Sequence, residues 1–465
     1  MRVLLFHGYM LRGTGSNIYN ANLAPALARL GHEVHLLCQD RQVRLDGVQI
    51  HNPDIGGLLP VYVKDPYEGF EVKAFQELTD EELDRYIDAN VTAVREVAAA
   101  AGGIDLALAN HLVMGPAILA RAGVAPFAAK VHGSALEYTV KPHPRFRPYA
   151  EEGMREASGV LVGSRHTAES LWEALPDLPE LPAKTRLGPP GVDLSAFHPW
   201  EPGDGGPRTK TSPAGTPSPG SGDALVVFVG KLIVSKGVDL LLAAWPLVKA
   251  AHPEARLEIA GYGEYEGGLR RMQAALEGGD LDDAREVSRL GWALEGGEEK
   301  PLEILSAFLA DPPPGYAEAA RAAAGSVEFV GRLEHDEVAE LLPRAEALVM
   351  PSTFPEAFGM VAVEAAACGA LPVSAGHSGM LEVSRQLAAA LPEEVAGLTS
   401  FPVAAGSVEA IADRLDRWLA LPSERREEAR AALVATVRRL WSWEGVARGM
   451  LAAAASELRK LPAPE

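Results

Sequence analysis

The segment PSTFPEAFGMVAVEAAACGALPV, residues Pro351–Val373, shows the pattern that decides the fold. A short aliphatic run ends at Met350, a turn of Ser, Thr and Pro follows, and helix-forming residues begin near Phe358. A second aliphatic run, Leu371–Ser374, comes directly after the helical residues. Strand, helix and strand in this order are typical of a parallel sheet with helices packed on its faces. We therefore expect the turn to lie at the carboxyl edge of such a sheet.

The same alternation of aliphatic runs and helical stretches extends in both directions from this segment. The strands expected in the first half are Arg2–Phe6, Glu33–Cys38, Val48–His51, Leu106–Ala109, Phe127–His132 and Gly159–Val162. Those expected in the second half are Leu225–Val229, Arg256–Ala260, Val327–Val330, Ala347–Met350 and Leu371–Ser374. Helical stretches such as Asn17–Leu30 and Asp80–Ala101 separate them, with Thr79 as a suitable N-cap for the second. The sequence thus predicts two doubly wound, Rossmann-like α/β domains.

The segment Glu201–Gly222 divides the two series of strands. It contains no hydrophobic residue larger than Ala or Pro, so we expect a flexible linker between a first domain at 1–200 and a second at 223–439. Two such domains face each other across a cleft, and ligands of these sheets bind at the carboxyl ends of the strands. We expect a helical insertion at about 264–326 and a helix at about 440–461 that packs back on the first domain.

The composition excludes several classes of protein. Asp and Glu number 63 against 43 Lys and Arg, a formal net charge of −20, which disfavours nucleic-acid binding. Cys38 and Cys368 are the two cysteines, too few for a disulfide scaffold or a cysteine zinc site, and they fit a reducing cytoplasm. The apolar start is too short for a signal peptide, and no apolar run is long enough to span a membrane. We expect a cytoplasmic protein, with weak peripheral contact with the inner face of the membrane left open.

Two glutamates in the opening segment are candidates for ligand binding. Glu356 and Glu364 stand eight positions apart, about 12 Å along the axis if the interval were helical. That separation is too wide for the paired carboxylates of a retaining hydrolase, but it suits a ligand with hydroxyl groups at both ends and a diphosphate between them. Backbone N–H groups of Phe358, Gly359 and Met360 would lie at a helix N-terminus, which favours an anion. Solvated glutamates are the alternative, although Glu364 lies in an apolar run and needs a partner there.

Cations follow two further strands of the second half. Lys231 and Lys236 lie in VVFVGKLIVSKG, where a loop at the sheet edge could reach a diphosphate. Gly331 and Arg332 follow the strand Val327–Val330 and offer backbone groups to a planar base. The alternative for both lysines is a solvated surface position.

The first half carries a glycine-rich turn, a strand-end acid and a strand-end histidine. Gly13, Gly15 and Ser16 lie between the first strand and a helix, but the third glycine of the dinucleotide fingerprint is missing. Asp40 ends the second strand, where a dinucleotide fold has its ribose-binding acid. His132 ends another strand, where a structural role is the alternative. A small basic stretch could bind an anionic acceptor or lipid headgroup, or be a solvated loop; it comprises Lys141, His143, Arg145 and Arg147.

Together these motifs resemble glycosyltransferase family 4, the retaining enzymes of GT-B architecture. PEAFGMVAVEAAACGALPV is similar to that family's signature with its two spaced glutamates, and VGKLIVSKGVDLLLAAW to its diphosphate loop. GPPGVDLSAFHP is similar to the close of its first domain, and GSRHTAESL to the segment before it. The resemblance covers nearly the whole chain.

The resemblance implies a nucleotide-sugar donor in the second domain. Lys231 and Lys236 would contact the diphosphate, Glu364 the ribose hydroxyls and Glu356 the transferred sugar. The amides of Phe358–Met360 would lie near the sugar and phosphate, and Gly331 and Arg332 by the base. His132 and the Gly13–Ser16 loop would come from the acceptor domain. Residue 231 is usually Arg in the family pattern and is Lys here, which replaces a bidentate contact by a point charge.

We therefore expect a retaining, metal-independent glycosyltransferase with Glu356, His132 and Lys236 as catalytic residues. The donor would be a nucleoside-diphosphate sugar, with UDP and GDP favoured and adenine not excluded, and no other cofactor is expected. The acceptor is a glycan, a lipid-linked glycan or a small molecule, and the oligomeric state is open. An NAD-dependent oxidoreductase and a non-catalytic nucleotide-sugar-binding subunit are the alternatives.

Overall fold

The computed structural model describes residues 1–13, 15–63, 67–200 and 224–464. These residues form two compact units, one of Met1–Gly191 with Trp441–Glu465 and one of Val192–Leu440. The expected linker Glu201–Gly222 lies outside the described residues.

The first unit contains a seven-stranded parallel sheet in the order β3-β2-β1-β6-β7-β8-β9. Its strands are β1 Arg2–Phe6, β2 Glu33–Leu37, β3 Val48–His51, β6 Leu106–Asn110, β7 Phe127–Lys130, β8 Gly159–Val162 and β9 Thr185–Leu187. The last residue of β1, Phe6, pairs with Leu37 on one side and Ala109 on the other. The strand order reverses between β1 and β6, which makes the carboxyl end of these strands a topological switch point.

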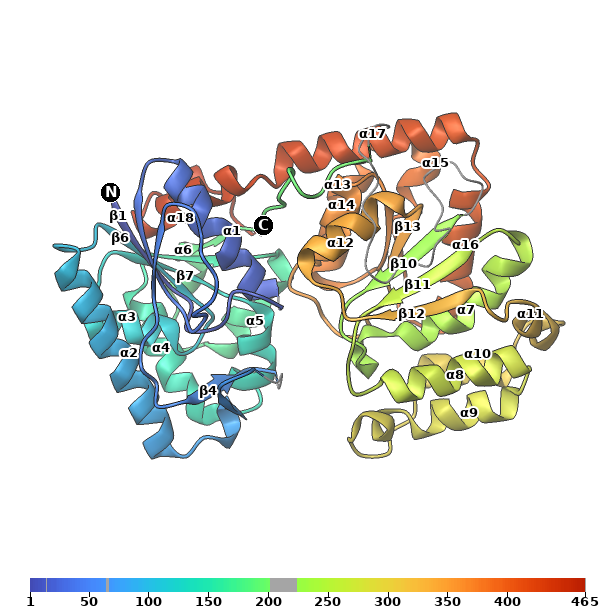
Figure 1. The fold of residues 1–465 in the computed structure, drawn as a ribbon, viewed down its shortest axis with the longest axis horizontal. Coiled ribbons are helices and arrows are strands. Elements are labelled where there is room, and N and C mark those ends of the chain that lie inside the picture. The colour runs from blue at the N-terminus through green and yellow to red at the C-terminus, as the bar shows by residue number, and fades with distance from the viewer. Residues whose placement is uncertain (14, 64–66, 201–223, 465) are drawn as a thin grey trace. The chain divides into compact units, whose positions relative to one another are not determined.

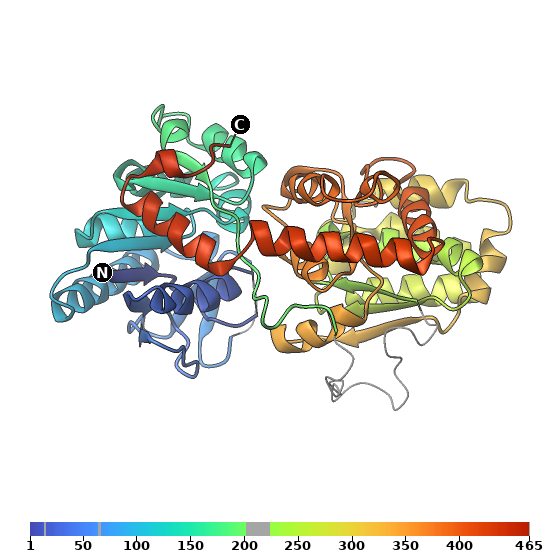
Figure 2. The same cartoon turned by 90° about the horizontal axis from the view of Figure 1, so that it is seen from above.

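Helices cover both faces of this sheet (Figure 1). Alternate residues of β1 point to opposite faces, so that Leu4 and Phe6 belong to one apolar core and Val3 and Leu5 to the other. The first core includes residues of α2 Asp80–Ala100, α3 Gly115–Ala122, α4 Arg147–Glu156 and α5 Arg165–Ala174. The second is closed by α1 Gly15–Arg29 and α18 Trp443–Ala454. The C-terminal helix α18 contacts β6, β7 and β8 and therefore forms part of the first unit (Figure 2).

The second unit contains a six-stranded parallel sheet in the order β12-β11-β10-β13-β14-β15. Its strands are β10 Leu225–Val229, β11 Arg256–Ala260, β12 Val327–Gly331, β13 Ala347–Met350, β14 Leu371–Ala375 and β15 Ser400–Phe401. Here the strand order reverses between β10 and β13. These two strands are neighbours in the sheet, and Val226 pairs with Ala347. The loops that follow β10 and β13 therefore meet at the switch point of this sheet.

Helices of the second unit form two groups (Figure 1). α7 Val238–Ala251 packs against α16 Ser407–Leu419, and α13 Met360–Ala367 packs against α17 Ser423–Leu440. Between β11 and β12 the chain forms α8 Glu266–Gly278, α9 Leu281–Leu290, the 3-10 turn η5 Trp292–Glu295, α10 Glu303–Ala310 and α11 Tyr316–Ala322. The expected helical segment between these strands is thus present.

Most of the expected elements are confirmed. Each predicted strand is observed within two residues of its expected ends, and Thr79 caps α2 by accepting the N–H of Glu82. Four strands were not predicted: β4 Leu58–Val61, β5 Glu71–Ala74, β9 and β15. All four are short, with two to four residues, and too short a run shows no period. Within the described residues no helix is both long and apolar enough to cross a membrane.

Candidate functional site

The loops after β10 and β13 bring Lys236 and Glu356 together. Lys236 ends the 3-10 turn η4, Val234–Lys236, and its ammonium group forms an ion pair with the Glu356 carboxylate. The next residue, Gly237, has φ 65°, and a Cβ there would lie 2.1 Å from the carbonyl oxygen of Pro351. Only glycine fits this approach. The close contact of the two loops places the ion pair at the switch point of the second sheet.

Two serines contact Glu356 and a histidine contacts both serines, and the sequence analysis identified none of the three. Ser352 donates its hydroxyl to Oε1 of Glu356 at 2.8 Å, and the Glu356 N–H donates to Oγ of Ser378 at 2.9 Å. Nε2 of His377 lies 2.8 Å from the Ser352 carbonyl oxygen, so this nitrogen carries the proton and Nδ1 accepts from Ser378, 3.1 Å away. The only sequence signal was the turn of small residues, GHSG, after β14.

Helix α13 begins later than expected. Its first residue is Met360, and the N-cap Gly359 has φ 91°. The chain from Glu356 to Gly359 is a loop because the left-handed conformation of Gly359 cannot continue a helix. The estimate of about 12 Å between the two glutamates, which assumed a helix, therefore does not apply. The N-terminus of α13 lies four residues after Glu356 in the chain, and a helix N-terminus favours an anion.

Glu364 has the partner that its apolar surroundings require. Its side chain is buried, 4% exposed, and accepts a hydrogen bond from Nε2 of His335 at 3.0 Å. His335 begins α12, His335–Leu341, and its ring lies 4.8 Å from that of Phe197. Burial lowers the pKa of His335, but the hydrogen bond and charge of Glu364, with Asp193 and Asp336, raise it above its ordinary value overall. Glu364 is thus paired with a cation-forming ring at the same edge of the sheet.

Lys231 and Arg332 share one aromatic ring. The Lys231 ammonium lies 5.8 Å and the Arg332 guanidinium 4.9 Å from the centre of the Tyr262 ring. Arg332 also donates to Glu334 at 2.9 Å, and Gly331, the last residue of β12, has φ 81°. These residues follow three adjacent strands, so the positive charges predicted from the sequence lie along one edge. Tyr262 was not predicted.

In the first unit, a chain of side-chain hydrogen bonds runs along the carboxyl edge of the sheet. Asn20 donates to Nδ1 of His7 at 3.0 Å, and Nε2 of His7 bonds Oδ1 of Asn17 at 3.0 Å. Asn110 donates to Oδ1 of Asn20 at 2.7 Å and accepts from Nε2 of His132 at 3.1 Å. The chain therefore fixes the Nε2–H tautomer of His132 and leaves Nδ1 with its lone pair.

Burial favours the neutral form of the histidines at this edge. Burial lowers the pKa of His7 to about 4. Burial is the main cause that lowers the pKa of His132 well below its ordinary value. Electrostatic interactions with His111, Lys130 and His7 lower it further. His111 is 1% exposed, and neither of its ring nitrogens has a hydrogen-bond partner among the described residues. Burial also lowers the pKa of Lys130 to about 7, and its Nζ donates to the Gly188 carbonyl at 2.6 Å.

The Asp40 side chain stabilises the loop that follows β2. Its buried carboxylate accepts N–H groups of Gln42 and Val43, both at 3.1 Å, and pairs with Arg12 at 3.4 Å. Asp40 thus organises its own loop, as an N–H acceptor does in an Asx turn. The glycine-rich turn lies next to it: Gly13 has φ 98°, and α1 starts at Gly15 followed by Ser16.

Two members of the basic stretch are bound within the first unit. Lys141 pairs with Glu137 at 3.0 Å and donates to Ser170 at 3.0 Å. Arg145 donates to the Leu78 carbonyl at 2.7 Å and lies over the Phe146 ring. These contacts give both side chains structural roles.

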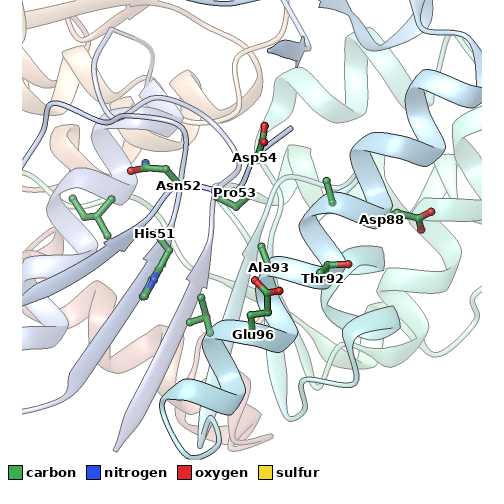
Figure 3. A pocket seen from close by; sticks show the side chains of 11 residues that line it. His51, Asn52, Pro53, Asp54, Asp88, Thr92, Ala93 and Glu96 are labelled. Carbon is green, nitrogen blue, oxygen red and sulfur yellow. The ribbon is translucent and has the colours of Figure 1, made fainter. Parts of the chain in front are cut away.

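A hollow of about 690 Å³ lies elsewhere in the first unit (Figure 3). It is lined by the end of β3 and the loop after it, including His51 and Asp54, and by α2, including Asp88 and Glu96. None of the site residues expected from the sequence lines it. Its acidic lining does not suit a diphosphate. Among the described residues, no group of three or more His, Cys, Asp and Glu could hold a metal ion.

Two family models match the chain. The model described as "Glycosyltransferase Family 4" matches residues 13–196, and "Glycosyl transferases group 1" matches 217–280 and 317–433. The match to the second model omits residues 281–316, which include α9, η5 and α10. Of the expected insertion at about 264–326, α8 lies inside the matched part, and residues 281–316 lie outside it.

Curated relatives extend over most of the chain. A "GDP-mannose-dependent monoacylated alpha-(1-6)-phosphatidylinositol monomannoside mannosyltransferase" of Corynebacterium glutamicum is 27% identical over 70% of this chain and 68% of its own length. A "D-inositol 3-phosphate glycosyltransferase" of Frankia alni is 28% identical over 94% of this chain and 93% of its own length.

Solved structures share the fold. A glycosyltransferase from Rickettsia africae has a TM-score of 0.61 at 14% identity and covers 98% of both chains. Sucrose-phosphate synthase from Thermosynechococcus elongatus has a TM-score of 0.58 at 20% identity, over 99% of this chain and 100% of its own. These likenesses confirm the expected GT-B fold.

Proposed function

Because the chain belongs to glycosyltransferase family 4, we propose that it moves a sugar from a nucleoside-diphosphate donor to an acceptor hydroxyl with retention of configuration. The second unit would bind the donor and the first unit the acceptor. The observation that most directly supports this proposal is the ion pair of Lys236 and Glu356 at the switch point of the second sheet.

Departure of the nucleoside diphosphate develops negative charge, and the loops after β10 and β13 hold groups that stabilise it. Lys236 and Lys231 would supply positive charge, and the amides of Phe358–Met360, at and just before the start of α13, would supply N–H donors. These groups stabilise the leaving group without a metal ion. Glu356, already hydrogen-bonded by Ser352, would accept hydroxyl protons of the transferred sugar once Lys236 turns to the diphosphate.

The remaining site residues would hold the nucleoside. Glu364 would accept hydrogen bonds from ribose hydroxyls, as it accepts that of His335. Gly331 and Arg332, at the end of β12, would lie beside the base. The bond from the sugar to the phosphate oxygen breaks, the acceptor oxygen attacks from the same face, and its proton passes to the leaving phosphate. No protein carboxylate needs to act as the nucleophile.

On the acceptor side, His132 and the Gly13–Ser16 turn are the proposed contacts. A neutral His132 with a lone pair on Nδ1 can accept a hydrogen bond from a hydroxyl group. The names of the relatives from C. glutamicum and F. alni point to a GDP-linked donor and an inositol-based acceptor as the first candidates. UDP-linked donors come next, since a HepE structure from Anabaena holds UDP and glucose.

The test begins with thermal unfolding in the presence of UDP, GDP, ADP or NAD at equal concentrations. A ligand at 100 times its dissociation constant stabilises the native state by about 2.7 kcal/mol, which raises Tm by several degrees. We expect one nucleoside diphosphate to do so and NAD not to. Turnover of sugars linked to that base, with the anomer of the product assigned by NMR, then tests retention. Stabilisation by NAD alone, or an inverted product, would contradict the proposal.

A further inference from the structure

The inserted segment 281–316 reaches the loop that carries Lys236. Within it, α9 packs on α8, and α10 packs on α9 and α7 (Figure 1). The turn η5 lies between α9 and α10 and ends at Glu295. Oε2 of Glu295 accepts the backbone N–H of Val234 at 2.7 Å, across 61 positions of sequence.

This N–H is one of those that the turn η4 cannot satisfy itself. Val234 is the first residue of η4, and the N-cap Ile233 offers no side-chain hydrogen bond. The first N–H groups of a helical turn have no partner within it. A side-chain oxygen from outside the turn therefore takes the place of an N-cap side chain as the acceptor of this N–H.

The rest of the loop is held from two other directions. Leu232 donates its N–H to the Tyr262 carbonyl at 2.8 Å, and Thr353 donates to the Ser235 carbonyl at 2.9 Å. These contacts come from the loops after β11 and β13, which the family model includes. Glu295 supplies the contact at the start of η4, two residues before Lys236, and it comes from the part that the match omits.

We infer that Glu295 is a positioning residue for the donor: it caps η4 and so fixes the place of Lys236 in the second unit. The inference rests on the proposed function, because it names the segment that prepares the proposed diphosphate loop. The pKa of Glu295 is raised overall. Burial is the main cause, the hydrogen bond from the Val234 N–H opposes it, and the charge of Glu264 adds to the rise. Glu295 needs no contact with the donor for this role.

Calorimetric titration with UDP, GDP and ADP tests the inference, using the intact protein and four variants. Glu295→Ala removes the acceptor, Glu295→Asp shortens its reach, and Glu295→Gln keeps an acceptor oxygen without the charge. Glu298→Ala changes an exposed glutamate of the same segment and serves as the matched control. We expect the dissociation constant of the nucleoside diphosphate to rise at least fivefold in the Ala and Asp variants. It should stay within twofold in the Gln and control variants.

Steady-state kinetics separate positioning from general damage. The KM of the donor should rise in the Ala and Asp variants, while the KM of the acceptor stays unchanged, because the proposed acceptor site belongs to the other unit. If the Ala variant does not fold, the comparison of Asp with Gln decides. Unchanged affinity in the Ala and Asp variants, or equal weakening in Gln, overturns the inference while the proposed function stands. Failure of the unaltered protein to bind any nucleoside diphosphate overturns the proposed function and, with it, this inference.

Discussion

At the scale of single residues, the carboxylate of Glu356 is the first group to change. Glu356→Gln keeps the shape of the side chain and an oxygen that accepts from Ser352, but it removes the charge that pairs with Lys236. We expect kcat to fall by roughly 10²–10³, the usual loss when an electrostatic contact of the transition state is removed. Thermal unfolding should show a Tm within a few degrees of the unaltered protein. Near-normal turnover would contradict the role proposed for Glu356.

The tautomer of His132 gives the second prediction at this scale. Asn110 accepts from Nε2 of His132 and donates to Asn20, so Asn110→Ala frees the imidazole to rotate or change tautomer. We expect kcat to fall roughly tenfold, because the acceptor hydroxyl loses an oriented hydrogen-bond partner. The affinity for the nucleoside diphosphate, measured by titration, should stay the same because Asn110 belongs to the other unit. A parallel loss of diphosphate affinity would show that Asn110 acts through the fold.

The contrast between predicted and missed residues has a physical origin. Lys236 and Glu356 could be predicted because each is a charged residue in a loop that follows a strand, and parallel strands bring their carboxyl ends to one edge. Tyr262 and Ser378 also lie just after strands, but an aromatic or hydroxyl side chain in such a turn carries no charge that marks it as a ligand-binding group. His335 begins α12, and its contact with Glu364 depends on how that helix packs. A sequence shows that buried Glu364 needs a partner, but it does not show which of many polar residues supplies it.

At the scale of elements, the buried Asp239 in the first turn of α7 makes stability depend on pH. Asp239 is 3% exposed, and burial raises its pKa to about 7, with its own backbone N–H opposing. The native state therefore holds a proton between about pH 4 and 7 that the unfolded state has released. This group destabilises the fold as pH rises through that window, with no further change above it.

Asp239→Asn should remove this pH dependence. Near pH 4 the two proteins should have similar Tm values, because the aspartate of the unfolded chain has only begun to release its proton there. Between pH 4 and 7 the Tm of the Asn variant should rise relative to the unaltered protein, and the difference should stay constant from pH 7 to 8. Scanning calorimetry across this range measures it. A difference independent of pH would mean that Asp239 is ionised in the native state.

Strands with a clear apolar pattern in the sequence could be predicted. Strands that form only by pairing with a neighbouring strand could not. The strands β1 and β10 are continuous apolar runs buried on both faces, which gives a strong local signal. The two-stranded sheet of β4 and β5 includes Pro60 and the polar residues Glu71 and Lys73. Neither segment therefore has a sequence pattern that predicts a strand. The helical segment between β11 and β12 could be predicted because it interrupts the regular alternation of strands and helices.

At the scale of the whole molecule, the chain returns to its first unit through α18. Trp443 begins this helix, is buried, and lies 5.5 Å from the Tyr19 ring in an edge-on arrangement. A Cβ on Gly191 would lie 2.8 Å from the Trp443 ring, so the indole fills its site completely. The stability of the first unit therefore depends on residues at the far end of the chain.

Trp443→Ala should accordingly destabilise the first unit by about 3–5 kcal/mol, lowering its unfolding transition by roughly 10 °C. Calorimetry with and without the nucleoside diphosphate assigns the transitions, because the ligand should raise that of the second unit alone. Leu440→Ala, which changes a residue 38% exposed at the end of α17, is the control and should leave both transitions in place. If Trp443→Ala lowered both transitions equally, the two units would unfold together. A loss of stability confined to the first unit lowers the transition of the second unit only when the two unfold as one.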